Sequence, residues 1–106
     1  MTASSGNHGL ACLDALARYG LQGRVVVPTN IAPGKRDKLE RLGAELVLHG
    51  TDCEEPERLG RELGATPGCL YVSPYNDPDI IAGQGTLGLE LLQQLPDMEV
   101  LFVSVG

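Results

Sequence analysis

The sequence is poor in aromatic residues and in positive charge, and it has no long hydrophobic run. It contains no Trp and a single Phe. No apolar stretch approaches the roughly 20 residues that cross a bilayer, so we expect no membrane-spanning segment. Eight Lys and Arg residues stand against 14 Asp and Glu residues, which gives a net charge of −6. Because nucleic acids and anionic membranes attract positive charge, we expect neither as a partner.

Paired cysteines and a secretory leader are also missing. Cys12, Cys53 and Cys69 form an odd set without C-x-x-C spacing, which predicts reduced thiols. The first eight residues are small and polar, so they predict no signal peptide and a cytoplasmic location. A length of 106 residues allows one domain at most, with a core of its own.

Short apolar runs alternate with helical periods along the chain. Runs rich in Val and Leu, typical of strands buried on both faces of a parallel sheet, occupy residues 24–28, 44–48, 69–73 and 99–105. Helices are expected between them at residues 6–19, 33–42, 54–63 and 78–95, the last with Asp77 as N-cap and Pro78 as its first residue. The pattern predicts an α/β domain in which a parallel sheet of about four strands carries helices on both faces.

Both ends of the sequence predict a longer parent chain. The sequence opens in a turn that leads directly into the first helix, with no strand expected before it. It ends immediately after the apolar run at residues 99–105. We therefore expect flanking sequence on both sides.

The segment SSGNHG, residues 4–9, concentrates polar side chains at the start of the first predicted helix. Unpaired backbone N–H groups and the positive end of the helix dipole point to such a place. Together they favour binding of an anion, either a carboxylate or a phosphate. Since Ser and Asn are also the commonest N-cap residues, simple capping is the alternative interpretation.

Other motifs follow SSGNHG in a characteristic order. They are VVP at residues 26–28, AP at 32–33, LGAE at 42–45, PYNDP at 74–78 and IAGQGT at 81–86. In this order the chain resembles the small domain of pyridoxal-phosphate (PLP) enzymes of the second fold type, the tryptophan synthase beta-like fold. The closest resemblance is to threonine dehydratases, serine dehydratases and serine racemases. It extends over essentially the whole chain, and SSGNHG together with IAGQGT makes it specific.

The resemblance implies roles for the residues of the SSGNHG turn. Asn7 would donate a hydrogen bond to the phenolic oxygen of the cofactor. Ser4, Ser5, Asn7 and His8 would bind the carboxylate of the amino-acid substrate. Ser5 would also lie on the cofactor face opposite the Schiff-base lysine, where racemases of this type have their second proton-transfer group.

Outside the turn, Gly106 matches the first glycine of the loop that binds the cofactor phosphate. Tyr75 matches a position near the substrate, where racemases tend to have Asn and dehydratases an aromatic residue. The Schiff-base lysine of the family lies upstream of the matched region. The two lysines present, Lys35 and Lys38, fall at the solvated start of a predicted helix and do not replace it. Residues 1–106 are thus expected to be a small domain plus the strand returning to an absent large domain.

The resemblance implies dehydration of a small hydroxy-amino acid, serine or threonine, to a 2-oxo acid and ammonia. Ser5 favours the alternative of a serine racemase or a bifunctional enzyme, whereas Tyr75 favours a dehydratase, which we place first. A truncated module that binds an anion or a partner without turnover is a third possibility. The full-length enzyme is expected to be a homodimer.

Three further patterns carry less information. The glycines of GQGTLG, residues 83–88, fit a dinucleotide fingerprint but fall inside a predicted helix. His49 and Cys53 have ligand-like spacing, but two groups do not make a metal site, so no metal is expected. The acidic residues between 52 and 57 complement a helix dipole and are interpreted as a solvated face.

Overall fold

The structure is a computed structural model that describes residues 1–104. The chain divides into two compact units, Met1–Pro74 and Tyr75–Gly106, and each is considered by itself. The first unit contains the sheet and three helices, and the second contains one helix and an extended segment.

A parallel sheet of three strands forms the centre of the first unit, and its strands are β1 (Thr2–Ala3), β2 (Arg24–Val27) and β3 (Glu45–Leu48). The strand β2 lies between the other two, with Val25 paired to Thr2 on one side and to Leu46 on the other. Val26 and Val27 are 0% exposed, as expected for a run buried on both faces. The predicted strands at residues 24–28 and 44–48 are confirmed.

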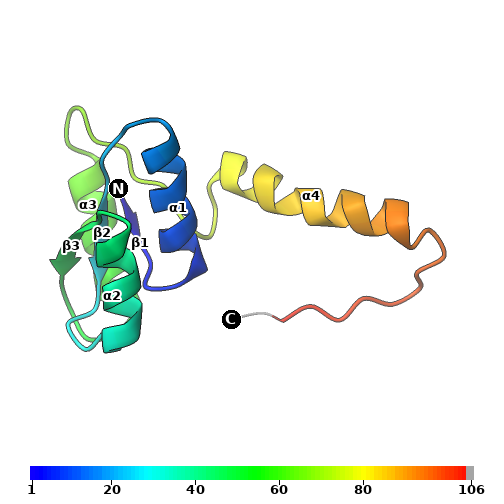
Figure 1. The fold of residues 1–106 in the computed structure, drawn as a ribbon, viewed down its shortest axis with the longest axis horizontal. Coiled ribbons are helices and arrows are strands. Elements are labelled where there is room, and N and C mark those ends of the chain that lie inside the picture. The colour runs from blue at the N-terminus through cyan, green and yellow to red at the C-terminus, as the bar shows by residue number, and fades with distance from the viewer. Residues whose placement is uncertain (105–106) are drawn as a thin grey trace. The chain divides into compact units, whose positions relative to one another are not determined.

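Helices cover both faces of this sheet, as predicted. They are α1 (Asn7–Arg18), α2 (Pro33–Arg41) and α3 (Glu54–Gly64). Figure 1 shows α1 and α2 packed together on one face, with α3 on the other. The core under α1 and α2 consists of Leu13, Val25, Val27 and Leu39, with Leu10 and Leu46 among the partly buried residues against it.

Two predictions about the edges of the sheet are wrong. The strand β1 precedes the first helix, where the sequence predicted none, because two residues are too few to show a strand period. Residues 69–73 and 99–104 do not form strands. In the described part of the chain the sheet therefore has three strands instead of about four.

Residues 70–72 nevertheless run beside the first residue in the manner of a parallel strand. The Met1 amino group donates a hydrogen bond to the Leu70 carbonyl, and the Val72 N–H donates to the Met1 carbonyl at 2.8 Å. These two bonds are those that one residue of a parallel strand makes to its neighbour. The apolar run at 69–73 thus predicted the position of this segment beside the sheet but not a full strand.

The second unit contains α4 (Pro78–Gln94) and the extended residues 99–104. Asp77 caps α4, since its carboxylate accepts hydrogen bonds from the N–H groups of Asp79 and Ile80 at 2.9 and 3.2 Å. This confirms the predicted N-cap, with Pro78 as the first helical residue. No side chain of α4 is buried. Within residues 1–104, no helix combines the length and the apolar character needed to cross a membrane.

Candidate functional site

The SSGNHG segment forms the turn between β1 and α1. Ser4 and Ser5 are half-buried, and Asn7, the first residue of α1, is exposed. The Ser4 hydroxyl accepts a hydrogen bond from the Gly6 N–H at 3.2 Å, which closes the turn on itself. Gly6 is the N-cap residue, with an extended backbone. The turn therefore brings four of the predicted site residues together: Ser4, Ser5, Asn7 and His8.

No side chain caps α1, and its first turn contains no acidic residue. The starts of α3 and α4 differ in this respect, whereas α2 also has neither a side-chain cap nor an acidic residue in its first turn. Asp52 accepts from the N–H groups of Glu54 and Glu55 at the start of α3, both at 2.9 Å, and Asp77 does the same for α4. The capping interpretation of the SSGNHG segment is therefore wrong. Its backbone N–H groups and the helix dipole can instead act on an anion at this end of α1.

Gly9 sets the position of the turn against the helix. It is buried, and a Cβ atom at this residue would lie 2.4 Å from the Ser4 carbonyl oxygen. Real Cβ atoms do not approach backbone so closely, and backbone cannot yield as a flexible side chain can. The last glycine of SSGNHG is thus needed for the first turn of α1 to pass the Ser4 carbonyl.

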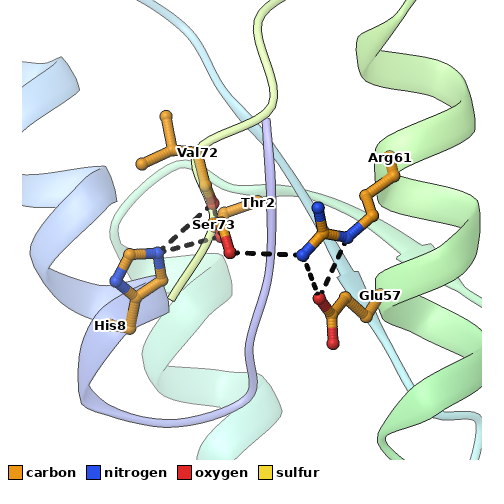
Figure 2. A network of polar contacts seen from close by, with 6 residues as sticks. All are labelled: Thr2, His8, Glu57, Arg61, Val72 and Ser73. Atoms are coloured by element: carbon orange, nitrogen blue, oxygen red, sulfur yellow. Dashed lines mark hydrogen bonds and ion pairs between the residues drawn. The ribbon is translucent and has the colours of Figure 1, made fainter. Parts of the chain in front are cut away.

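The His8 side chain points into the unit (Figure 2). Its Nε2 atom lies 3.0 Å from the Thr2 hydroxyl and 3.4 Å from the Val72 carbonyl oxygen. The Cys12 sulfur, one helical turn further along α1, lies 3.5 Å from the same nitrogen. Burial raises the pKa of the Cys12 thiol, and the positive amino terminus opposes this shift. The predicted substrate ligand His8 therefore uses its ring within the protein, which leaves its backbone N–H for an anion.

The polar network continues to α3. Ser73 is 5% exposed, and its hydroxyl lies 3.5 Å from Nη2 of Arg61. The Arg61 guanidinium in turn donates to the Glu57 carboxylate at 2.6 and 3.0 Å, and it lies over the ring of Tyr71 at 5.4 Å. The hydrogen bond to Glu57 raises the pKa of Arg61. Figure 2 shows the polar groups from His8 on α1, past Thr2 and Ser73, to Arg61 and Glu57 on α3.

The other predicted site residues lie elsewhere. Tyr75 is 61% exposed and is the first residue of the second unit. Gly106, the predicted contact to the cofactor phosphate, lies outside the described residues. Lys35 and Lys38 are exposed on α2. Within residues 1–104, no three His, Cys, Asp or Glu side chains gather in a way that could hold a metal ion.

The sequence prediction missed the residues that support the turn. Thr2 and Ser73 are the buried polar residues of the described chain, yet neither belongs to a recognisable motif. The Thr2 hydroxyl could be recognised as a buried polar group only if β1 had been predicted. Because β1 has two residues, the sequence pattern did not reveal it.

The whole chain, residues 1–106, matches the family described as pyridoxal-phosphate dependent enzyme. The chain belongs to this family. It is 42% identical over 106 residues to the biosynthetic L-threonine dehydratase of Escherichia coli (strain K12), covering all of this chain and 21% of that protein. It is 38% identical to the L-threonine ammonia-lyase of Thermotoga maritima, again over all of this chain and over 26% of that protein. The chain thus spans about a quarter or less of the length of these relatives.

Solved structures of PLP enzymes have the same fold. A pyridoxal 5'-phosphate-dependent aspartate racemase superimposes with a TM-score of 0.87 at 43% identity, over 98% of this chain and 32% of that one. Maize serine racemase superimposes with a TM-score of 0.79 at 31% identity, over 92% of this chain and 30% of that one. These similarities confirm the resemblance expected from SSGNHG and IAGQGT and the α/β fold of this PLP family.

Proposed function

We propose that this chain is part of a PLP-dependent serine or threonine dehydratase, an ammonia-lyase that converts a small hydroxy-amino acid to a 2-oxo acid and ammonia. The observation that carries the proposal is the SSGNHG turn at the uncapped start of α1, in a chain 42% identical to a threonine dehydratase. When bound, PLP supplies an electron sink for the electrons left at Cα after its proton departs. The residues of this chain would bind and orient the groups around it.

The turn has the donors that such a site requires. The exposed amide of Asn7 is suited to donate to the phenolic oxygen of the cofactor. The hydroxyls of Ser4 and Ser5 and the N–H groups at the start of α1 are suited to the substrate carboxylate, because the helix dipole stabilises negative charge there. Tyr75 would contact the substrate side chain, and Gly106 would begin the phosphate-binding loop.

We further propose that residues 1–106 are the small domain and the strand that returns to a large domain in the complete enzyme. That larger part would supply the lysine that forms the Schiff base with PLP, since the two lysines of this chain lie on α2 away from the SSGNHG turn in sequence. The exposed apolar side chains of α4 and residues 100–103 would be covered by it. The complete enzyme would be a cytoplasmic homodimer that binds neither nucleic acid nor membrane.

Amino-acid racemisation is the second candidate function. It is favoured by Ser5 and by the similarity to an aspartate racemase and a serine racemase. Racemisation needs a proton donor on each face of the planar Cα, and one lysine serves only one face. The Ser5 hydroxyl is the group of this chain that would serve the other.

Replacing Ser5 in the complete enzyme separates the two candidates. With Ser5→Ala, racemisation and reaction with the D-substrate should be lost. Dehydration of L-serine or L-threonine should stay within about tenfold, or about 1.4 kcal/mol of activation barrier. The assay is release of pyruvate or 2-oxobutanoate beside chiral analysis of the remaining amino acid. Asn7→Ala is the matched comparison and should weaken both reactions, because it disturbs the cofactor itself. A racemase rate that survives Ser5→Ala would contradict the two-base role.

The third possibility, a module without turnover, is tested by looking for the Schiff-base lysine. Its presence in the complete protein would exclude such a module, and its absence would support one. The coding sequence around this chain should contain a lysine in a strand-to-helix turn upstream and a run of glycines after Gly106. The 106-residue chain itself, mixed with PLP and treated with borohydride, should show only weak, scattered labelling of Lys35 and Lys38. Stoichiometric labelling of either lysine would contradict the assignment of the reactive lysine to another part of the protein.

A further inference from the structure

Thr2 lies at the centre of the polar network beneath the SSGNHG turn (Figure 2). It is 2% exposed, and its hydroxyl donates a hydrogen bond to the Val72 carbonyl at 2.7 Å. The same oxygen lies 3.0 Å from His8 Nε2. A hydroxyl has one hydrogen, and the Val72 carbonyl can only accept, so this hydrogen is committed to Val72. His8 Nε2 must therefore donate to Thr2.

This arrangement selects one tautomer of His8. When the imidazole is neutral, its proton is on Nε2, since both the Thr2 oxygen and the Val72 carbonyl accept from that nitrogen. The Cys12 sulfur, at 3.5 Å, is a weak acceptor and suits the same assignment. The ring is therefore held in a single orientation by groups from β1 and from residue 72.

The other side of the network is also anchored. The Val72 N–H donates to the Met1 carbonyl at 2.8 Å, so residue 72 is tied to the backbone beside Thr2 as well as to its hydroxyl. The next residue, Ser73, is buried and lies 3.5 Å from Arg61 of α3. Buried polar networks whose members are all satisfied hold their parts rigidly, and loss of one member leaves the others unpaired at a cost.

We infer that Thr2 is a positioning residue for the SSGNHG turn. Its hydroxyl fixes the His8 ring, and His8 directly follows Asn7, so the first turn of α1 is held with Asn7 and its N–H groups facing outward. Thr2 touches neither substrate nor cofactor in this assignment and acts through His8. The inference rests on the proposed function only where it predicts how a change at Thr2 affects substrate binding. The assignment of the His8 tautomer stands on the contacts alone.

Two substitutions at Thr2 distinguish a hydrogen-bonding role from a packing role. Thr2→Val keeps the shape and the strand preference of the side chain but removes the hydroxyl. Thr2→Ser keeps the hydroxyl but removes a methyl group from a buried site. A packing role predicts that Val is tolerated better than Ser, whereas the positioning role predicts the reverse order.

The first measurement is the ¹⁵N spectrum of the His8 ring in the 106-residue chain, recorded at a pH high enough for the ring to be neutral. The unsubstituted chain and Thr2→Ser should show the proton on Nε2, and Thr2→Val should show a mixture of tautomers. The second measurement is steady-state kinetics of the complete enzyme with L-threonine. Thr2→Val should raise KM on the order of tenfold with kcat little changed, because a displaced turn binds the substrate carboxylate more weakly. Thr2→Ser, which keeps the hydroxyl, should have a KM close to that of the unsubstituted enzyme.

Each outcome decides the question. A proton on Nδ1 in the unsubstituted chain overturns the inference, and this requires no variant to fold. Retention of the Nε2 tautomer in Thr2→Val, or a KM for Thr2→Val at or below that of Thr2→Ser, overturns it too. If the complete enzyme turns over no amino acid, the proposed function fails, while the tautomer measurement still decides the role of Thr2.

Discussion

The two units of the chain differ in the solvent exposure of their apolar residues. In Met1–Pro74 the side chains of Val26, Val27 and Leu39 are 0% exposed, whereas in the second unit Leu87 and Leu89 of α4 are 60 and 63% exposed. A sheet with helices on both faces buries its own apolar surface, but a single helix has no second layer to pack against. We therefore expect the first unit to fold on its own core. The sequence of α4 is suited to a surface that its own unit does not provide.

A buried charge should break this comparison most strongly. Val26→Asp places a carboxylate at a fully buried position with no partner, so it should cost more than about 4 kcal/mol and unfold the first unit. The matched change Leu89→Asp, on exposed α4, should alter the free energy of unfolding by less than about 0.5 kcal/mol. Urea unfolding followed by circular dichroism measures both. A large loss from Leu89→Asp would show that α4 is buried in solution.

Truncation of leucines tests the same contrast with smaller changes. Leu39→Ala removes a side chain from the core beside Leu13 and Val27, and it should cost about 2–5 kcal/mol. Leu92→Ala on α4 removes a side chain that is 63% exposed and should cost less than about 0.5 kcal/mol. Thermal unfolding of the two variants gives the difference. Equal losses would contradict the division into a packed and an unpacked unit.

The same substitution in two helices should have effects of opposite sign. In α3, a Cβ atom on Gly60 would lie 2.7 Å from the Tyr71 ring, so Gly60→Ala should cost about 1–3 kcal/mol. In α4, Gly85 has no atom within 4 Å of that position, so Gly85→Ala should stabilise the helix by up to about 1 kcal/mol. The helix content and the midpoint of unfolding of each variant measure the two effects. In the complete enzyme Gly85→Ala should instead be destabilising, if a second domain packs closely on α4.

The smallest effect is expected at the N-cap of α4. Asp77→Ala removes two hydrogen bonds to the first turn and should cost that helix about 1 kcal/mol. Hydrogen exchange should then be faster in residues 78–94 and unchanged in residues 25–27 and 46–48. Faster exchange in the sheet residues would mean that the two units unfold together.

The sequence predicted the periodic elements of this fold well and the short ones poorly. The four helices have enough residues to show a period, the continuous apolar runs indicated β2 and β3, and Asp77 with Pro78 marked the start of α4. The strand β1 has two residues, so no pattern could reveal it. The run at 69–73 has the composition of a strand, but whether it becomes one depends on how long a partner strand lies beside it.

The candidate site shows the same limit. The SSGNHG turn was identifiable because it concentrates polar side chains at a helix start and is followed by IAGQGT, and the structure brings Ser4, Ser5, Asn7 and His8 together there. The direction of the His8 ring was not predictable, because its partners, Thr2 and the Val72 carbonyl, are 6 and 64 residues away in the sequence. A sequence pattern describes the side chains of one segment, whereas the burial of a polar group depends on segments that meet only in the folded chain.

The bond from Thr2 to Val72 also sets an order of events during synthesis. Its partners are 70 residues apart, and ribosomes add about 5–20 residues per second, so on the order of ten seconds separates their appearance. Before residue 72 is available, β2, α2 and β3 can already pair through contacts of shorter range. The His8 ring has no carbonyl of residue 72 to meet in that interval. The SSGNHG turn, although it precedes most of the first unit in the sequence, is therefore among the last parts of this unit to acquire its final geometry on the ribosome.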